Sequence, residues 1–401
     1  MIRYRASWVV PISGSPIRDG WVTVDGGRVL ALGQRRAAPA SDERDLGDVV
    51  LMPGLVNAHT HLELSYLRDA VPPSSSFVGW VRSVMAARRQ WPAPAASVIL
   101  QSVGSAIEEA AACGTALVGD ISNTLVTFGP LARSSLAAIV FNEVIRFNGA
   151  DAASVVEQAS RQLEELLPTD LVRTSLAAHA PYSVAPLVFR EIRRAVDRDP
   201  LARCSVHLSE SVEEVEFLRT GQGPWRAMLE ELGSWDPSWI PPCVSPVQYL
   251  DDSGFLDERV LAVHGVQMTS SDLARLAARR TTLVTCPRSN GYTGAGAPPL
   301  EAFYASGVRV AVGTDSLASA PSLNVFDELA AMRALAPDVP ASALLDSATR
   351  QGARALGFES EFGSIEPGKR ARLLAVSVPP GTDDVEEYLL GGVRPDEIGW
   401  V

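Results

Sequence analysis

The pattern of hydrophobic and polar positions changes twice along the chain. Residues 1 to about 50 contain short apolar runs separated by turns, including "GWVTVDGGRVLALG", whose Asp-Gly-Gly is a hairpin signal. From about 51 to 350, short β-branched runs alternate with amphipathic stretches such as "SVVEQASRQLEELL" and "SDLARLAARR". After a last helical stretch, "SALLDSATRQGARALG", the tail "GSIEPGKRARLLAVSV" returns to strand and turn character. The pattern predicts a central α/β region flanked by two β pieces.

The central region contains eight apolar runs that each read as one β-strand. In chain order they are "LMPGLVNAHTH", "TALVGD", "AAIVFNEV", "RTSLAAHA", "RCSVHLSE", "VLAVHGV", "TTLVTCPRSN" and "VRVAVGTDS". Eight strand and helix units predict a (β/α)8 barrel of the TIM type, in which chemistry gathers at the C-terminal strand ends. We expect this α/β barrel over residues 51–357. Residues 1–50 and 358–401 are expected to form a small β-sandwich side domain built from both termini.

Composition and charge narrow the classes of function. The net charge of -12 argues against binding to nucleic acid or to anionic membranes, which would need a basic face, so a small-molecule substrate is expected. Four scattered cysteines with no CxxC suit neither a zinc finger nor a disulfide framework. No apolar run approaches the roughly 20 residues that span a bilayer, and no signal peptide is visible. We therefore expect a cytoplasmic protein; a homodimer is compatible with the sequence, which does not define the oligomeric state.

Histidines gather at the predicted strand ends. His59 and His61 are two residues apart on one predicted strand, so their side chains point to the same face. His207, His264 and Asp315 close three other predicted strands. A single such histidine is more often a structural residue, but structural histidines should show no preference for strand ends. Imidazole together with carboxylate suits a first-row divalent metal, so the pattern predicts a metal site at the mouth of the barrel.

Glu210 follows His207 by three residues, where the strand gives way to its loop. A carboxylate there could reach a metal-bound water and carry its proton, since hydrolysis needs a group that takes a proton and hands it to the leaving group. The alternative is a solvated loop acid, because "ESVEEVE" continues as a charged helix face. The neighbouring metal-ligand pattern favours the first interpretation.

These motifs resemble those of a known family. "PGLVNAHTH", "HAPYSV", "HLSES", "VHG", "CPRSN" and "GTDS" follow the order found in the amidohydrolase superfamily, and the chain is most similar to its cytosine deaminase-like and chlorohydrolase-like branch. The resemblance covers almost the whole chain. It implies a divalent metal ion, Zn²⁺ or alternatively Fe²⁺, held by His59, His61, His207 and Asp315. It also implies that Glu210 shuttles protons, that His264 polarises the electrophile or the water, and that Asp315 acts as a base.

The number of metals and the reaction type also follow from this resemblance. Binuclear members bridge two metals through a carboxylated lysine at the fourth strand end. The only lysine here, Lys369, lies in the C-terminal β piece, and the fourth strand carries His179 instead. The resemblance therefore implies one metal and a hydrolytic deaminase that releases ammonia from an aromatic amine. The combined HxE and PCxxC signature of the other zinc deaminase fold is absent, because the chain has no PCxxC.

The substrate is less well defined. "HTHLELS", "HAPYSV", "SPVQYLDDSGFL" and "CPRSNGYTGAGAPPL" look most like aminodeoxyfutalosine deaminases, which act on an adenine nucleoside on the futalosine route to menaquinone. That substrate ends in a benzoate, so a cation is expected in the pocket, because guanidinium binds carboxylate through two parallel hydrogen bonds. The candidate cations are Arg288 in first place, then Arg68 and Arg146, each of which could instead be a surface residue.

Four further residues are candidates for substrate binding. Ser289 adjoins Arg288 in the same motif, and Glu63 and His179 could bind ribose hydroxyls or the purine edge. Glu63 could equally be a structural carboxylate, and Trp80 could either line the pocket or pack its own helix.

Several other functions share the same metal chemistry. They are deamination of S-adenosylhomocysteine or methylthioadenosine, of guanine or of cytosine, and hydrolysis of chlorinated triazines. A noncatalytic binding relative is an alternative of a different class. It would have no need for Glu210 beside its metal, which favours an enzyme.

Overall fold

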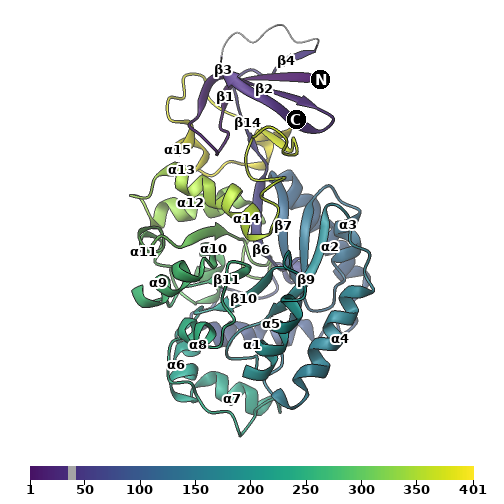
Figure 1. Cartoon of the computed structure of the whole chain (residues 1–401), viewed down its shortest axis with the longest axis vertical. Helices are drawn as coiled ribbons and strands as arrows, with labels where there is room; N and C mark the ends of the chain where they lie inside the picture. The colour runs from purple at the N-terminus through teal and green to yellow at the C-terminus, as the bar shows by residue number, and fades with distance from the viewer. Residues whose placement is uncertain (35–41) are drawn as a thin grey trace.

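The computed structural model describes residues 1–34 and 42–401, which form two sheets (Figure 1). Figure 1 shows both chain ends in the smaller sheet, at one end of the molecule, with the larger sheet and its helices beyond it. The predicted fold class, a TIM-type barrel with a small β side domain built from both termini, is therefore confirmed. No helix in the described part of the chain is long and apolar enough to cross a membrane.

The larger sheet is the predicted barrel. Its eight strands pair in parallel with their neighbours in chain order, and each of the eight predicted runs overlaps one of them. The strands are β6 (Leu55–Thr60), β7 (Thr115–Ser122), β8 (Ala137–Val144), β9 (Val172–Ala178), β10 (Cys204–Leu208), β11 (Val260–His264), β12 (Thr282–Thr285) and β13 (Arg309–Val312). Every residue of β7 and β8 is buried, as expected for parallel strands covered on both faces.

The barrel closes where the first and last strands meet. A parallel bridge joins Thr60 to Asp315, and the Asp315 N–H donates to the His59 carbonyl at 3.1 Å. Gly313 permits this approach, because a Cβ there would lie 2.6 Å from the His59 carbonyl oxygen. Closure therefore brings His59 and Asp315, which are far apart in sequence, to one point on the rim.

The smaller sheet joins both ends of the chain. Its strands are β1 (Ile2–Val9), β2 (Ile17–Asp25), β3 (Arg28–Gln34), β4 (Glu43–Asp45), β5 (Val49–Pro53), β14 (Leu373–Ser377) and β15 (Ile398–Trp400). β5 pairs with both β1 and β14, so it links the N-terminal strands to the C-terminal ones. The predicted β-sandwich is refined in this respect, because the described strands belong to one seven-stranded sheet. The Asp-Gly-Gly hairpin joins β2 to β3, with Gly26 and Gly27 at positive φ.

Helices follow the barrel strands. They are α1 (Phe77–Arg88), α2 (Ser97–Ala112), α3 (Phe128–Ala132), α4 (Ala152–Glu164), α5 (Pro186–Val196), α6 (Val212–Thr220), α7 (Pro224–Glu231), α8 (Pro246–Asp252), α9 (Ser270–Arg279), α10 (Pro287–Thr293), α11 (Leu300–Ala305), α12 (Val325–Leu335), α13 (Ala341–Asp346), α14 (Gly352–Ala355) and α15 (Val385–Leu389). Short 3-10 helices are η1 (Leu62–Leu67), η2 (Gly149–Asp151) and η4 (Pro395–Glu397), and η3 (Ser347–Gln351) is a π-helix. The predicted last helix is thus divided into α13, η3 and α14. Helices α6 and α7 lie at the end of the molecule opposite the smaller sheet (Figure 1).

Candidate active site

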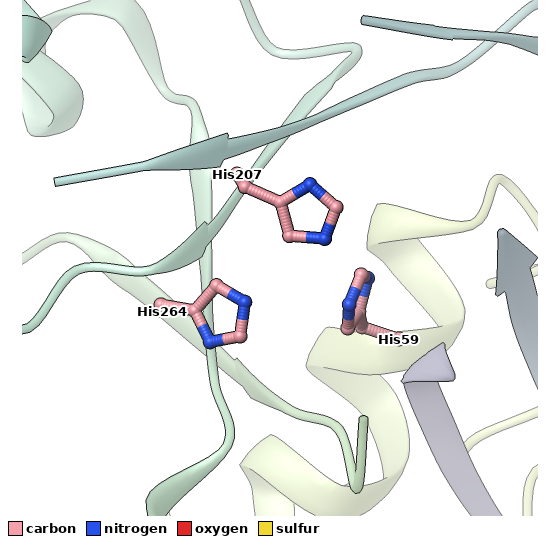
Figure 2. Close-up of side chains that lie close together, drawn as sticks. All are labelled: His59, His207 and His264. Carbon is pink, nitrogen blue, oxygen red and sulfur yellow. The ribbon is translucent and has the colours of Figure 1, made fainter. Parts of the chain in front are cut away.

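Four histidines and one aspartate from four stretches of chain converge at the strand ends. Figure 2 shows the rings of His59, His207 and His264 turned toward one another, with centroids 5.0 to 5.7 Å apart. His61 Nε2 lies 3.3 Å from His207 Nε2 and 3.6 Å from Asp315 Oδ1. The structure thus brings together the four residues predicted to bind a metal.

The free nitrogen lone pairs of this cluster point inward. His207 Nδ1 lies 2.9 Å from the His179 carbonyl oxygen and His264 Nδ1 lies 2.9 Å from Asn290 Oδ1. Because a carbonyl or amide oxygen only accepts, both Nδ1 atoms carry the hydrogen and both Nε2 atoms are acceptors. Both ring nitrogens of His59 are buried without a hydrogen-bond partner among the described residues. A buried imidazole with no partner fits a bound cation better than an apolar core.

Asp315 offers one oxygen to this cluster and anchors the other. Ser289 Oγ donates to Oδ2 at 2.6 Å and Ser319 Oγ donates to it at 3.1 Å. Oδ1 lies 3.6 Å from His61 Nε2 and 3.8 Å from His59 Nε2. Ser289 therefore orients Asp315 and is not among the described residues that line the cavity.

Two of these residues have strained backbone. His264 has a φ of 77° and Asp315 a φ of 60°, in the left-handed region that residues with a side chain seldom adopt. Each stands at or just beyond the end of its strand, where such a backbone turns the side chain toward the barrel axis. Strain of this kind concentrates at functional sites, which supports assigning one here.

Burial keeps the imidazoles neutral. Desolvation lowers the pKa of His59 well below its usual value, that of His61 to about 3 and that of His264 to about 4. Neutral imidazole is the form that binds a metal. Burial acts to raise the pKa of Asp315, but the surrounding histidines and the hydrogen bond from Ser289 together outweigh it, so the pKa is lowered. An ionised aspartate among neutral histidines is a donor set for a divalent metal ion.

Three overlapping groups in the described chain could hold an ion. Two of them contain His59, one with His207 and His264 and the other with His61 and Asp315. The third combines Glu143, His179 and His207. The unpartnered His59 nitrogens favour a site formed by the first two groups together.

Glu210 stands beside this cluster. Its Oε1 lies 3.5 Å from His264 Nε2, and the side chain is 4% exposed. Burial, followed by the charges of Asp315 and Glu214, raises the pKa of Glu210 well above its usual value. A carboxyl group whose pKa is raised is suited to general acid catalysis.

A cavity of about 580 Å³ opens above the histidines. His61, His207, Glu210, His264 and Asp315 form its floor. Its walls are largely apolar and aromatic, contributed by α1, α7 and the segments after β8 and β9. Tyr182 stacks on Trp225 in this wall, with ring centroids 3.8 Å apart. An apolar cavity with convergent polar groups at one end has the character of a small-molecule site.

Three of the predicted substrate-binding residues line this cavity: His179, Trp80 and Arg146. His179 Nδ1 lies 2.5 Å from Ser183 Oγ, which leaves Nε2 of the ring without a hydrogen-bond partner among the described residues. Arg146 is exposed and forms an ion pair with Asp151 at 2.6 Å. The indole of Trp80 is buried in the same wall as Trp225.

Arg288, the first candidate cation, lies elsewhere. Its guanidinium is 3.3 Å from Asp327 and 3.5 Å from Glu328, and it donates to Ser322 Oγ at 3.1 Å. It is not among the described residues that line the cavity. The prediction is corrected: α10 begins at Pro287, and its first turn directs Ser289 toward Asp315 and Arg288 toward α12.

Glu63 and Arg68 are likewise structural. Glu63 Oε2 accepts from Ser122 Oγ at 2.6 Å and from the Asn123 and Thr124 backbone at 3.1 Å, so it ties η1 to the end of β7. Arg68 pairs with Glu109 of α2. Neither is among the described residues of the cavity wall, so the predictions of substrate contact are corrected for both.

Arg88 and Arg89 line the cavity but were not predicted from the sequence. Trp80, Val84 and Arg88 are four residues apart on α1 and share one helix face, so an assignment of Trp80 to the wall could have included Arg88. Arg88 donates to Asn123 Oδ1 at 3.0 Å and to Glu63 Oε1 at 3.2 Å. The guanidinium of Arg89 forms no ion pair with the described residues.

Known proteins share this sequence and fold. The Amidohydrolase family matches residues 50–389. The aminodeoxyfutalosine deaminase of Deinococcus radiodurans is 33% identical over 87% of this chain and 84% of its own. The 5-methylthioadenosine/S-adenosylhomocysteine deaminase of Moorella thermoacetica is 28% identical over 98% of this chain and 90% of its own. The crystal structure of an adenosine deaminase from Xanthomonas campestris with bound zinc has a TM-score of 0.80 at 28% identity, covering 99% of this chain and 90% of that one.

The match to the family includes the barrel and every residue of the histidine and carboxylate cluster. The resemblance inferred from the sequence motifs is therefore confirmed. The chain belongs to the amidohydrolase family and is a hydrolytic deaminase.

Proposed function

We propose that the protein deaminates an adenine nucleoside that carries an anionic 5′ substituent, most specifically aminodeoxyfutalosine on the route to menaquinone. The observation that carries the proposal is the cavity, in which a donor cluster for one metal ion lies at one end and apolar walls edged by Arg88, Arg89 and Arg146 extend from it. A free base such as cytosine or guanine would leave most of these walls uncovered. Similarity to the aminodeoxyfutalosine deaminase of Deinococcus radiodurans supports the same substrate.

The metal is assigned as one Zn²⁺ ion, with Fe²⁺ as the alternative, held by His59, His61, His207 and Asp315. The zinc bound in the Xanthomonas campestris structure supports zinc. Bound there, the ion would supply a water molecule whose pKa is lowered to about 7. The single lysine, Lys369, pairs with Glu366 in the C-terminal segment, so it is not placed to bridge two ions.

The protein side chains divide the proton transfers between them. Asp315, ionised and fixed through Oδ2, is the base that accepts the proton of the attacking water. Glu210 delivers a proton to the ring or to the leaving amine, because burial raises its pKa and so favours the protonated form. The Nδ1–H of His264 donates to Asn290, so Nε2 of His264 can only accept a hydrogen bond. An accepting Nε2 favours a hydrogen bond from the water over donation to the electrophile.

Ammonia release tests the proposal for the amine substrates, and chloride release measures turnover of a chlorinated triazine. Purified zinc-loaded protein is incubated with aminodeoxyfutalosine, S-adenosylhomocysteine, methylthioadenosine, adenosine, guanine, cytosine and a chlorinated triazine, and kcat/KM is measured for each. We expect aminodeoxyfutalosine to have the highest value. A higher value for S-adenosylhomocysteine would move the assignment to that alternative, and turnover of the free bases or the triazine alone would contradict the nucleoside proposal.

Arg89 and Arg146 are the expected contacts for the anionic substituent, because both lie in the exposed part of the cavity wall. Replacing either by methionine should raise KM for aminodeoxyfutalosine by about 10-fold, the loss expected for one charge-assisted hydrogen bond, and leave KM for adenosine little changed. Steady-state kinetics with both substrates measure this. Arg161→Met is the matched control, since Arg161 lies exposed on α4. An equal rise of KM for both substrates would show that neither arginine binds the anionic substituent.

A further inference from the structure

A second buried carboxylate holds the loop that carries Glu210. β10 ends at Leu208 and α6 begins at Val212, so only three residues connect them. Glu214, in the first turn of α6, is fully buried. Its Oε1 accepts the Ser209 N–H at 3.0 Å and its Oε2 accepts the Glu210 N–H at 2.8 Å. Both oxygens of Glu214 are therefore bonded to the backbone beside the catalytic carboxyl.

This arrangement differs from an ordinary helix cap. In a capping box the carboxylate of the third helical residue accepts a hydrogen bond from the N–H of the N-cap residue itself. The Thr269 and Asp272 pair of α9 has that form. In α6 the N-cap Ser211 accepts the Glu214 N–H at 3.3 Å, but the Glu214 carboxylate reaches one and two residues further back, to Glu210 and Ser209. The carboxylate of α6 thus holds the loop of the site, whereas that of α9 caps its own helix and also accepts a hydrogen bond from Ser245 before α8.

The loop needs such support because its backbone is strained. Ser209 has a φ of 52°, in the left-handed region. This turn takes the chain out of β10 and sets Glu210 Oε1 3.5 Å from His264 Nε2. The Glu214 carboxylate accepts hydrogen bonds from the N–H groups of Ser209 and Glu210, on either side of the strained residue Ser209, and these bonds oppose relaxation of the turn.

A carboxylate at this position has an electrostatic cost. Burial raises the pKa of Glu214 to about 8, although its backbone hydrogen bonds act in the other direction, and its charge, when present, acts against ionisation of Glu210. Glutamine would remove the repulsion and keep the shape, but it offers one accepting oxygen where two N–H groups need partners. The pair of backbone bonds is thus the feature that glutamate alone supplies.

We propose that Glu214 is a positioning residue for the reaction: through the backbone of Ser209 and Glu210 it fixes the Glu210 carboxyl where proton transfer occurs. This inference rests on the proposed function, in which Glu210 carries the proton.

The test is Glu214→Gln in the zinc-loaded protein. We expect kcat to fall by about 100-fold, the effect of a displacement of about 1 Å at a reacting group, with KM for the nucleoside and zinc per chain unchanged. Asp272→Asn is the matched control, because it removes a capping carboxylate from the same barrel without contact to Glu210. It should lower Tm and leave kcat unchanged. An equal fall of kcat in both variants would indicate general loosening and overturn the proposal.

A double-mutant cycle separates positioning from stability. If Glu214 acts only through Glu210, Glu210→Gln with Glu214→Gln should be no slower than Glu210→Gln alone. A further 10-fold loss in the double variant, or a Glu214→Gln protein with unchanged kcat, would overturn the inference and leave the proposed function intact. A wild-type protein that releases ammonia from none of the nucleosides would overturn the proposed function itself, and this inference with it.

Discussion

Glu210→Gln should reduce kcat by roughly 10²- to 10⁴-fold, the contribution of a positioned general acid or base, while the metal content stays the same. Glutamine preserves the size and the neutral form of a side chain whose burial already favours protonation. It has no proton to transfer to the leaving amine. Ammonia release under saturating substrate and metal analysis of the same preparation measure the two quantities.

Two outcomes would contradict this account of Glu210. Full activity in a metal-replete Glu210→Gln protein would remove Glu210 from the mechanism. Loss of metal together with activity would mean that Glu210 is a ligand. The distance of 3.5 Å from its Oε1 to His264 Nε2, and its absence from the metal-binding groups found in the described chain, argue against the latter.

His61→Ala should lose both metal and activity. His61 Nε2 faces His207 Nε2 and Asp315 Oδ1, and alanine removes one donor from the cluster. Loss of a residue that only supports a ligand commonly costs 10- to 100-fold in affinity, so loss of a ligand should cost at least about 100-fold. Metal retained after dialysis against a weak chelator measures the effect.

His179→Ala is the informative companion to that variant. His179 belongs to the third possible metal-binding group, with Glu143 and His207, and not to the groups that contain His59. We expect His179→Ala to keep the ion and to weaken substrate binding. If His179→Ala lost the ion and His61→Ala kept it, the metal site would lie at Glu143 and not at His59.

The barrel could be predicted because its signals are local. Run lengths and β-branched composition located all eight strands, and "AAIVFNEV" coincides with β8 (Ala137–Val144). Strand alternation placed His59 and His61 on one face of their strand. Because catalytic residues gather at the strand ends of such barrels, His207 and Asp315 could be predicted to join the same site. Chain closure through Thr60 and Asp315 then made these distant residues neighbours.

The cavity wall could not be predicted as well, because side-chain direction and ion pairing decide it. Arg288 and Ser289 are adjacent in sequence, yet on α10 one contacts Asp327 and the other Asp315. Glu63 is near the barrel mouth, but the backbone of Asn123 and Thr124 occupies its carboxylate. Both outcomes depend on partners more than 20 residues away, which no local pattern reveals.

The number of metal ions bound per chain is the decisive measurement for the assigned metal site. Purified protein, loaded with zinc and passed through a desalting column, is analysed for metal by mass spectrometry. We expect one ion per chain in the wild type and none in His61→Ala. A wild-type protein that retains no divalent ion, or that binds two, would contradict the assignment of a single metal to the histidine and aspartate cluster.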